Sequence, residues 1–271
     1  MARFYLSAAI ISACLVSLTA CSNSQTLPKA TTTTLPDHAK AAASAPKWSY
    51  EGKTGPEFWG DLEEAGACKL GEAQSPINIQ QAHASLDAAP LMNYSKNAEI
   101  RIHDNGHTIV YTPTTPNNSI TLNNERFELK QFHYHTPSEH QFNGHAYPAE
   151  MHFVHANSSG NLAVIGVMLN QGASNPMAQQ LLNGSKLSAK NKTDFTVNGI
   201  DLNALIPAKA TFYHYDGSLT TPPCSEQVQW FIANQPLALA KDQIAIMTNL
   251  YDGNNRPTQN QGSRTIKQLS N

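Results

Sequence analysis

The sequence predicts a mainly β protein of the α+β class: a single domain with a large, central, mostly antiparallel twisted sheet and a few peripheral helices. Short segments of alternating apolar and polar residues recur from residue 47 onward, which is the pattern of half-buried strands. Gly, Pro and Asn residues separate these segments, as they do at turns. With 271 residues, 40% of them hydrophobic, the chain is long enough for one large domain.

The first 20 residues are expected to be a targeting segment. Arg3 precedes an apolar run over residues 8–18, which is shorter than the roughly 20 residues of a spanning helix. The run ends Leu18-Thr19-Ala20-Cys21, which resembles a bacterial lipoprotein signal with cleavage before Cys21 and a lipid on that cysteine. A secretory signal cut after Ala20 is the alternative. Mass spectrometry distinguishes the two, because only the first leaves diacylglycerol on Cys21.

Residues 21–46 are expected to be a disordered linker, because Ser, Thr, Ala and Pro dominate and apolar periodicity is absent. Either signal takes the mature chain out of the cytoplasm. The expected location is the periplasm or cell envelope, with the chain held at a membrane surface by a lipid at Cys21, or otherwise secretion. The sequence leaves the oligomeric state open, a homodimer included.

Residues 47–271 are expected to form the folded domain, which begins at an aromatic cluster. Eight segments have the composition and alternation of strands: 99–103, 108–112, 119–122, 127–135, 150–156, 163–169, 211–215 and 227–232. Helices are few: 176–182, a turn near 202–205, and 240–250.

Charge and histidine content narrow the function. The chain carries 18 Lys and Arg against 20 Asp and Glu, a net charge of −2. No basic excess is available to neutralise phosphates, so we expect no nucleic-acid partner. Histidine is concentrated instead, because six of the eleven lie between residues 133 and 155. This clustering favours a metal site or an acid–base site.

The segment Gln131-Phe132-His133-Tyr134-His135 carries the first part of the strongest signal. Alternate side chains of a strand point to the same side. His133 and His135 therefore share one face of the strand, and Gln131 lies on that face too.

The strand that begins at Glu150 carries the second part. His152 shares its face with Glu150 and Val154. The 14-residue connection favours antiparallel neighbours, and three neutral imidazoles with an open fourth position are typical of catalytic zinc. Zinc is favoured over copper or iron because no cysteine or carboxylate ligand is expected. Gln131 and Glu150, each two residues before a ligand histidine, are expected to orient the rings.

Two cysteines, Cys68 and Cys224, remain for the folded domain once the signal is removed and Cys21 is modified. An even pair in an oxidising compartment favours a disulfide, and two free buried thiols are the alternative. A bridge would close a loop of about 157 residues, and the chain-entropy model gives it about 5 kcal/mol.

Several motifs, taken together, resemble the α-class carbonic anhydrases of the bacterial extracytoplasmic type. They occur in family order across residues 47–271: Trp48-Ser49-Tyr50, Gly55-Pro56-Glu57-Phe58-Trp59-Gly60, Gln74-Ser75-Pro76-Ile77-Asn78-Ile79, Asn105-Gly106-His107, the two histidine strands, Ser138-Glu139-His140, Gly217-Ser218-Leu219-Thr220-Thr221-Pro222-Pro223 and Asn255-Arg256-Pro257. The short Thr136-Pro137-Ser138 connection departs from animal members and is similar to bacterial ones. Asn260 replaces a proline common in the family.

The resemblance implies zinc-dependent reversible hydration of carbon dioxide to bicarbonate and a proton, by attack of zinc-bound hydroxide. It implies that His133, His135 and His152 bind Zn²⁺. Thr220 would be the gatekeeper, whose hydroxyl accepts from the zinc-bound hydroxide and donates to Glu139.

The resemblance also assigns supporting roles. His107 would be the proton shuttle, and Tyr50, Asn105 and Thr221 would hold the waters leading to it. Ring orientation would come from Gln131, Glu150 and the backbone of Asn254. His140 would be a structural partner of Glu150 and Tyr215, not a ligand. Cys68 and Cys224 stand where secreted members form a disulfide. The implied substrate-binding residues are Val154, Val164, Leu219, Thr220, Thr221, Val228 and Trp230.

Other functions stay open at this point. A catalytically silent, carbonic-anhydrase-like binding module is the alternative, but the residues that such relatives lose are all present here. A zinc peptidase would be expected to carry a helical His-Glu-x-x-His motif, which the sequence lacks. Outside the resemblance, His107 is a histidine in an Asn-Gly turn, and Val228 and Trp230 are ordinary core residues.

Overall fold

The computed structural model describes residues 48–269. The targeting segment 1–20, the lipidation site Cys21 and the linker 21–46 lie outside the described residues. Those expectations therefore stay predictions.

Strands make up most of the regular structure. In chain order they are β1 (Asn78–Ile79), β2 (His83–Ser85), β3 (Leu91–Asn93), β4 (Ala98–Asp104), β5 (Ile109–Pro113), β6 (Ser119–Leu122), β7 (Glu125–His135), β8 (Gln141–Phe142), β9 (His145–Ala146), β10 (Ala149–Ala156), β11 (Leu162–Gln171), β12 (Phe195–Ile200), β13 (Phe212–Ser218), β14 (Glu226–Ala233), β15 (Leu237–Leu239) and β16 (Lys267–Leu269). The helical elements are the 3₁₀ turns η1 (Gly52–Thr54), η2 (Pro56–Asp61) and η3 (Leu202–Leu205), and the α-helices α1 (Ala67–Leu70), α2 (Pro176–Asn191) and α3 (Lys241–Leu250).

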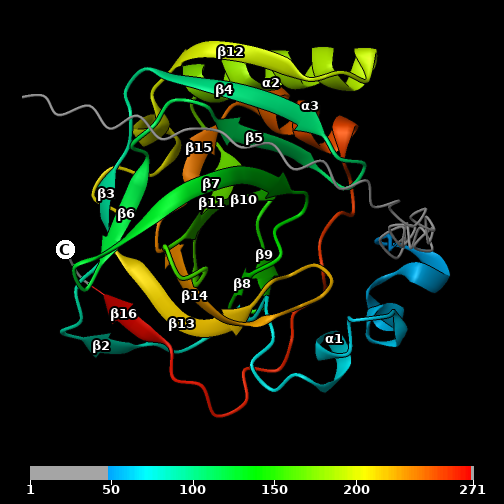
Figure 1. The fold of residues 1–271 in the computed structure, drawn as a ribbon, viewed down its shortest axis with the longest axis vertical. Helices are drawn as coiled ribbons and strands as arrows, with labels where there is room; N and C mark the ends of the chain where they lie inside the picture. The colour runs from blue at the N-terminus through cyan, green and yellow to red at the C-terminus, as the bar shows by residue number, and fades with distance from the viewer. Residues whose placement is uncertain (1–47, 270–271) are drawn as a thin grey trace, which may run out of the picture. The chain divides into compact units, whose positions relative to one another are not determined.

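One 13-stranded twisted sheet dominates the fold (Figure 1). Its main path runs β12-β4-β5-β7-β10-β11-β14-β13-β16-β2, with β6, β3 and β15 attached beside it. Most neighbours are antiparallel, while β11–β14, β11–β15 and β16–β2 are parallel. A second sheet of three short strands joins β1, β8 and β9. The predicted fold class is confirmed, with a parallel component that the sequence did not indicate.

Alternation along β7 and β10 gives these strands a core face and a site face. Phe132 and Tyr134 of β7 and Met151 and Phe153 of β10 are buried in the main hydrophobic cluster. The predicted ligand histidines alternate with them. Both strands lie inside the sheet, because β5 pairs with β7 on one side and β11 with β10 on the other.

Helix α2 is longer than expected, since it continues past residue 182 to Asn191. Its start is well defined, because the Asn175 side chain accepts hydrogen bonds from the first-turn backbone N–H groups. The expected end was wrong because Asn183-Gly184-Ser185 are poor helix formers. A Cβ at Gly184 would lie only 2.5 Å from Ile102 Cδ1, so this glycine lets α2 pack closely against β4.

Strand β12 is an element that the sequence pattern did not predict. It pairs antiparallel with β4 at an edge of the large sheet. An Asn198-Gly199 step lies inside it, with Gly199 at φ +78° and a register shift in the pairing. The irregular step conceals the period-two pattern that marks a strand.

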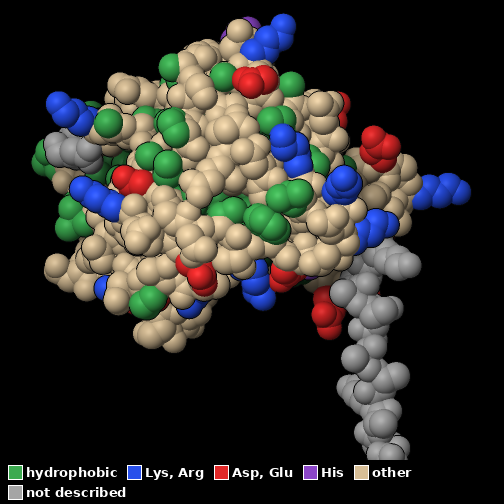
Figure 2. Space-filling view, turned by 90° about the horizontal axis from the view of Figure 1, so that it is seen from above, with side chains coloured by type: hydrophobic (Ala, Val, Ile, Leu, Met, Phe, Trp, Pro, Cys, Tyr) green, Lys and Arg blue, Asp and Glu red, His purple; other side chains and the backbone are tan. Residues whose placement is uncertain are grey.

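The charged surface is mixed. Figure 2 shows basic and acidic side chains interspersed over the face that it presents. This distribution agrees with the net charge of −2. Within residues 48–269, no helix is both long and apolar enough to cross a membrane.

Candidate functional site

The two histidine strands are antiparallel neighbours, as their sequence predicted. His152 of β10 pairs directly with His133 of β7, and Glu150 pairs with His135. Because directly opposed residues point to the same face of a sheet, all three predicted ligand side chains lie on one side.

The three imidazoles converge on one point. The ligand nitrogens that His133, His135 and His152 offer lie within 4.8 Å of one another. Nε2 of His135 is buried and has no hydrogen-bond partner among the described residues, which is unfavourable unless another group binds it. A buried, orphaned nitrogen in a group of three histidines fits a metal ion.

Each of these imidazoles is oriented by a second contact. His133 Nδ1 lies 2.9 Å from Gln131 Oε1, and His135 Nδ1 lies 2.6 Å from the backbone oxygen of Asn254. Since these oxygens accept, Nδ1 donates and Nε2 keeps its lone pair for a metal. His152 Nε2 lies 2.8 Å from Glu150 Oε1, within ion-pair distance but without hydrogen-bond alignment. This contact leaves His152 Nδ1 for the metal.

Glu150 is the centre of a buried network behind the ligands. Its Oε2 accepts hydrogen bonds from the backbone N–H groups of Glu139 and His140, and its Oε1 contacts His140 Nδ1 at 2.7 Å. His140 Nε2 in turn lies 2.6 Å from the hydroxyl of Tyr215. Both ring nitrogens of His140 are thus engaged, in agreement with the expected structural role.

Burial and charge set the ionisation of the group. Burial holds the pKa of His133 well below its usual range and also lowers the pKa of His135, which favours the neutral imidazoles that bind metals. Burial alone would raise the pKa of Glu150, but His140 and His152 hold it well below its usual range. Burial opposes protonation of His152, yet the Glu150 carboxylate raises its pKa.

Glu139 lies beside the ligands with one free oxygen. Its Oε1 accepts a 2.7 Å hydrogen bond from the Arg256 backbone N–H. Its Oε2 lies 3.4 Å from His135 Nε2 and, within the described chain, has no hydrogen-bond partner. The implied bond from Thr220 to Glu139 is therefore not formed, although Thr220 is buried. The free oxygen is directed toward the histidines instead.

His107 lies in a tight turn and lines a pocket together with His133 and His135. The side-chain oxygen of Asn105 accepts hydrogen bonds from the backbone N–H groups of His107 and Thr108, both at 2.9 Å. The amide oxygen of Asn105 is thus used by the turn, and its NH₂ group is what remains for solvent. Burial lowers the pKa of His107.

Trp48 is a partner of His107 that the sequence reasoning did not predict. The two rings are stacked, with centroids 3.7 Å apart and planes 8° apart. One pocket joins this pair to the histidine group and to the residues expected to hold waters; it is lined by Trp48, Tyr50, Asn105, His107, Thr108, Val110, Gln131, His133, His135 and Thr221.

The implied substrate-binding side chains form an apolar wall beside His152. Val154 pairs with Val164 across β10 and β11, and Val164 pairs with Trp230 across β11 and β14. The Trp230 ring lies 4.8 Å from the His152 ring. Val228 is buried in the same cluster and Leu219 packs against it. The structure thus brings all five together.

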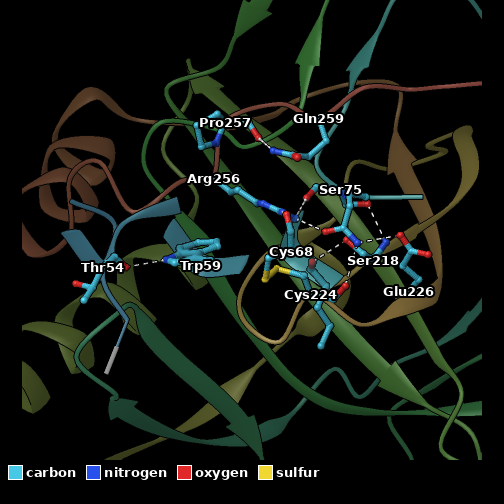
Figure 3. Close-up of a disulfide and its surroundings, with 12 residues drawn as sticks. Thr54, Trp59, Cys68, Ser75, Ser218, Cys224, Glu226, Arg256, Pro257 and Gln259 are labelled. Atoms are coloured by element: carbon cyan, nitrogen blue, oxygen red, sulfur yellow. Dashed lines mark hydrogen bonds between the residues drawn. A yellow bond between two sulfur atoms is a disulfide. The ribbon is translucent and has the colours of Figure 1, made fainter. Parts of the chain in front are cut away.

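The Cys68–Cys224 disulfide is formed, with Cα atoms 5.0 Å apart (Figure 3). Beside it lies Arg256, which donates to the backbone oxygen of Cys68 at 2.9 Å. The sequence indicates Arg256 only as part of the Asn255-Arg256-Pro257 motif. Its burial could not be read from periodicity, because Arg256 lies between strands in an irregular segment.

A mostly β fold with three convergent histidines, two of them fully buried, defines a class of metal-site protein, and comparisons identify the family. A family model described as eukaryotic-type carbonic anhydrase matches residues 54–271. The chain is 41% identical over 225 residues to a carbonic anhydrase of Klebsiella pneumoniae (82% of this chain, 91% of the relative). It is 37% identical over 230 residues to that of Pectobacterium carotovorum (83% and 92%).

A solved structure agrees with these relatives. A hyperthermostable carbonic anhydrase from an active hydrothermal vent chimney matches with a TM-score of 0.76 at 41% identity, covering 83% of this chain and all of that one. The chain therefore belongs to the α-carbonic anhydrase family and is an enzyme of that kind.

Proposed function

We propose that this enzyme catalyses zinc-dependent, reversible hydration of carbon dioxide to bicarbonate and a proton. The observation that carries the proposal is the convergence of His133, His135 and His152, with the orphaned Nε2 of His135 among them. A donor set of three neutral imidazoles suits zinc. Zinc held there would lower the pKa of a bound water to about 7 and so supply a nucleophile at neutral pH.

In this proposal Glu139 and Thr220 aim the attacking oxygen. Glu139 Oε2 is buried and free to accept a hydrogen bond. If the Thr220 hydroxyl donates to it, the same hydroxyl can only accept a bond from the nucleophile. The nucleophile then keeps a lone pair directed at carbon dioxide.

The apolar wall would hold carbon dioxide, which carries no charge and little polarity. Val154, Val164, Leu219, Val228 and Trp230 exclude water from the side of the site next to His152. Thr221 lies in the pocket with His133 and His135, and together with Thr220 it completes the proposed substrate-binding set.

The test of the proposed function is stopped-flow carbon dioxide hydration by the purified mature protein, before and after zinc is removed with a chelator. We expect activity in the zinc-loaded protein, loss after chelation, and recovery when one equivalent of zinc is returned. Activity that persists in protein shown by elemental analysis to hold no metal would contradict the proposal.

His107 is proposed to carry the released proton from the site to solvent. Its lowered pKa keeps the ring neutral, and so able to accept a proton, at neutral pH. His107→Ala should lower kcat by about a hundredfold in weak buffer, with recovery when imidazole is added.

The control for this variant is His145→Ala, which removes an exposed histidine of β9 outside the pocket. It should leave kcat unchanged. A His107→Ala enzyme with wild-type kcat in weak buffer would remove the shuttle assignment.

Export and anchoring through Cys21 are part of the proposal as well. Their support is the sequence of the first 46 residues, which lies outside the described structure. A lipid on Cys21 would place the reaction at a membrane surface.

A further inference from the structure

Arg256 is a buried cation that none of the proposed steps uses. It is only 2% exposed. Its guanidinium donates to Gln74 Oε1 at 2.9 Å and to the backbone oxygens of Ser75 at 2.7 Å and Cys68 at 2.9 Å (Figure 3). Its other close partner is the face of Trp59, 5.8 Å away.

Such an arrangement is unfavourable for a charge. A buried ion without an ion-pair partner loses hydration that neutral oxygens only partly replace. Arg256 forms no salt bridge within the described residues. Burial lowers the pKa of Arg256 to about 10, and the charge of the Glu139 carboxylate only partly opposes that shift. A neutral residue of similar size would avoid this cost of burial. The presence of a charged guanidinium at this position therefore needs an explanation.

The backbone of the same residue holds Glu139. The Arg256 N–H donates to Glu139 Oε1 at 2.7 Å. Since Oε1 is fixed in this way, the direction of the free Oε2 depends on where the Arg256 backbone stands. The guanidinium bonds determine that position from the other end of the residue.

The segment that receives the guanidinium also holds the Thr220 loop. Gln74 Nε2 donates to the Cys224 backbone oxygen at 3.1 Å. Ser75 and Ser218 exchange two hydrogen bonds, at 2.9 and 3.0 Å, just before Thr220. We call residues 68–75 the brace. The brace is therefore connected to both Glu139 and Thr220. It reaches Glu139 through Arg256, and it reaches the loop of Thr220 through residues 218 and 224.

We propose that the Arg256 side chain is a positioning residue for carbon dioxide hydration: by fastening residue 256 to the brace, it fixes the Glu139 carboxylate relative to Thr220. The inference rests on the proposed function. A displacement of about 1 Å in a reacting constellation can cost about a hundredfold in rate. The guanidinium therefore acts on catalysis without touching substrate or metal.

The test compares Arg256→Lys and Arg256→Gln with Arg264→Lys. Arg264 is a matched control, because it also bonds to backbone oxygens and lies over an aromatic ring, Tyr215 at 5.5 Å, but does not touch Glu139. Each protein is measured by stopped-flow hydration far below its unfolding temperature, with zinc content determined in parallel. Both Arg256 variants should lose about tenfold to about a hundredfold in kcat/KM while holding one zinc.

The pattern of loss separates positioning from general weakening of the fold. Added imidazole replaces only the proton shuttle, so it should not restore kcat/KM in the Arg256 variants. Arg264→Lys should keep wild-type kcat/KM. Wild-type kcat/KM in Arg256→Gln at full zinc would overturn the proposal. So would a loss that zinc depletion accounts for, or an equal loss in Arg264→Lys.

Two further outcomes are informative. If Arg256→Gln does not fold, Gln74→Met removes one guanidinium acceptor, together with the Gln74 bonds to Cys224 and Glu226, without altering Arg256. It should lower kcat/KM at full zinc; an unchanged value overturns the proposal. If the wild-type protein shows no carbon dioxide hydration that a chelator removes, the proposed function is overturned, and this inference with it. If the wild type is active, the variants test the role of Arg256 alone.

Discussion

His135→Ala is expected to reduce carbon dioxide hydration to the level of protein-free buffer and to remove most of the bound zinc. The reason is the position of this ring: it is 1% exposed, its Nδ1 is fixed by the Asn254 backbone oxygen, and its Nε2 has no hydrogen-bond partner among the described residues. Alanine leaves two imidazoles, which cannot complete the three-ligand set of catalytic zinc. Stopped-flow hydration and elemental analysis on the same sample measure both effects.

The matched control is His155→Gln. His155 is a buried histidine too, but it belongs to β10 and lies on the core face, where its Nε2 contacts the Tyr94 hydroxyl at 2.7 Å. This variant is expected to lose stability and to keep one zinc. Full activity of His135→Ala at one zinc per chain would reject the ligand assignment.

Of the changes proposed here, removal of the Cys68–Cys224 disulfide is expected to lower the stability of the folded protein most. The bond joins residues 156 apart in sequence. In the chain-entropy model a loop of this length gives about 5 kcal/mol, which is an upper estimate because the reduced unfolded chain retains some structure. The Cys68→Ser/Cys224→Ser double variant should therefore lower the free energy of unfolding by about 2 to about 5 kcal/mol in denaturant titration.

Wild-type protein unfolded in the presence of a thiol reductant should behave like the double variant, since both lack the cross-link. A difference below about 0.5 kcal/mol between oxidised wild type and the double variant would show that the loop constraint contributes little.

The parts of the site that follow strand parity were accessible from sequence. His133 and His135 share a face because they are two residues apart, and His152 joins them because β10 is the antiparallel neighbour of β7. Gln131 was accessible for the same reason. The eight strands predicted from sequence also carry a period-two pattern that hydrophobicity reveals.

The rest of the site depends on chain segments that no local pattern connects. Asn254 reaches His135 across 119 residues, and Arg256 reaches Glu139 across 117. The stacking of Trp48 on His107 likewise depends on how the first described residues fold back. Family resemblance supplied the Asn254 backbone role, and only the structure supplied the other two.

The interior position of β7 and β10 has a consequence for how the proposed metal would bind. Both strands are hydrogen-bonded along both edges, so their backbones cannot shift without breaking pairs on either side. The sheet thus fixes the relative positions of His133, His135 and His152 before a metal ion binds. Divalent ions of different preferred geometry would meet the same three donors, and the sheet would impose its coordination on each of them.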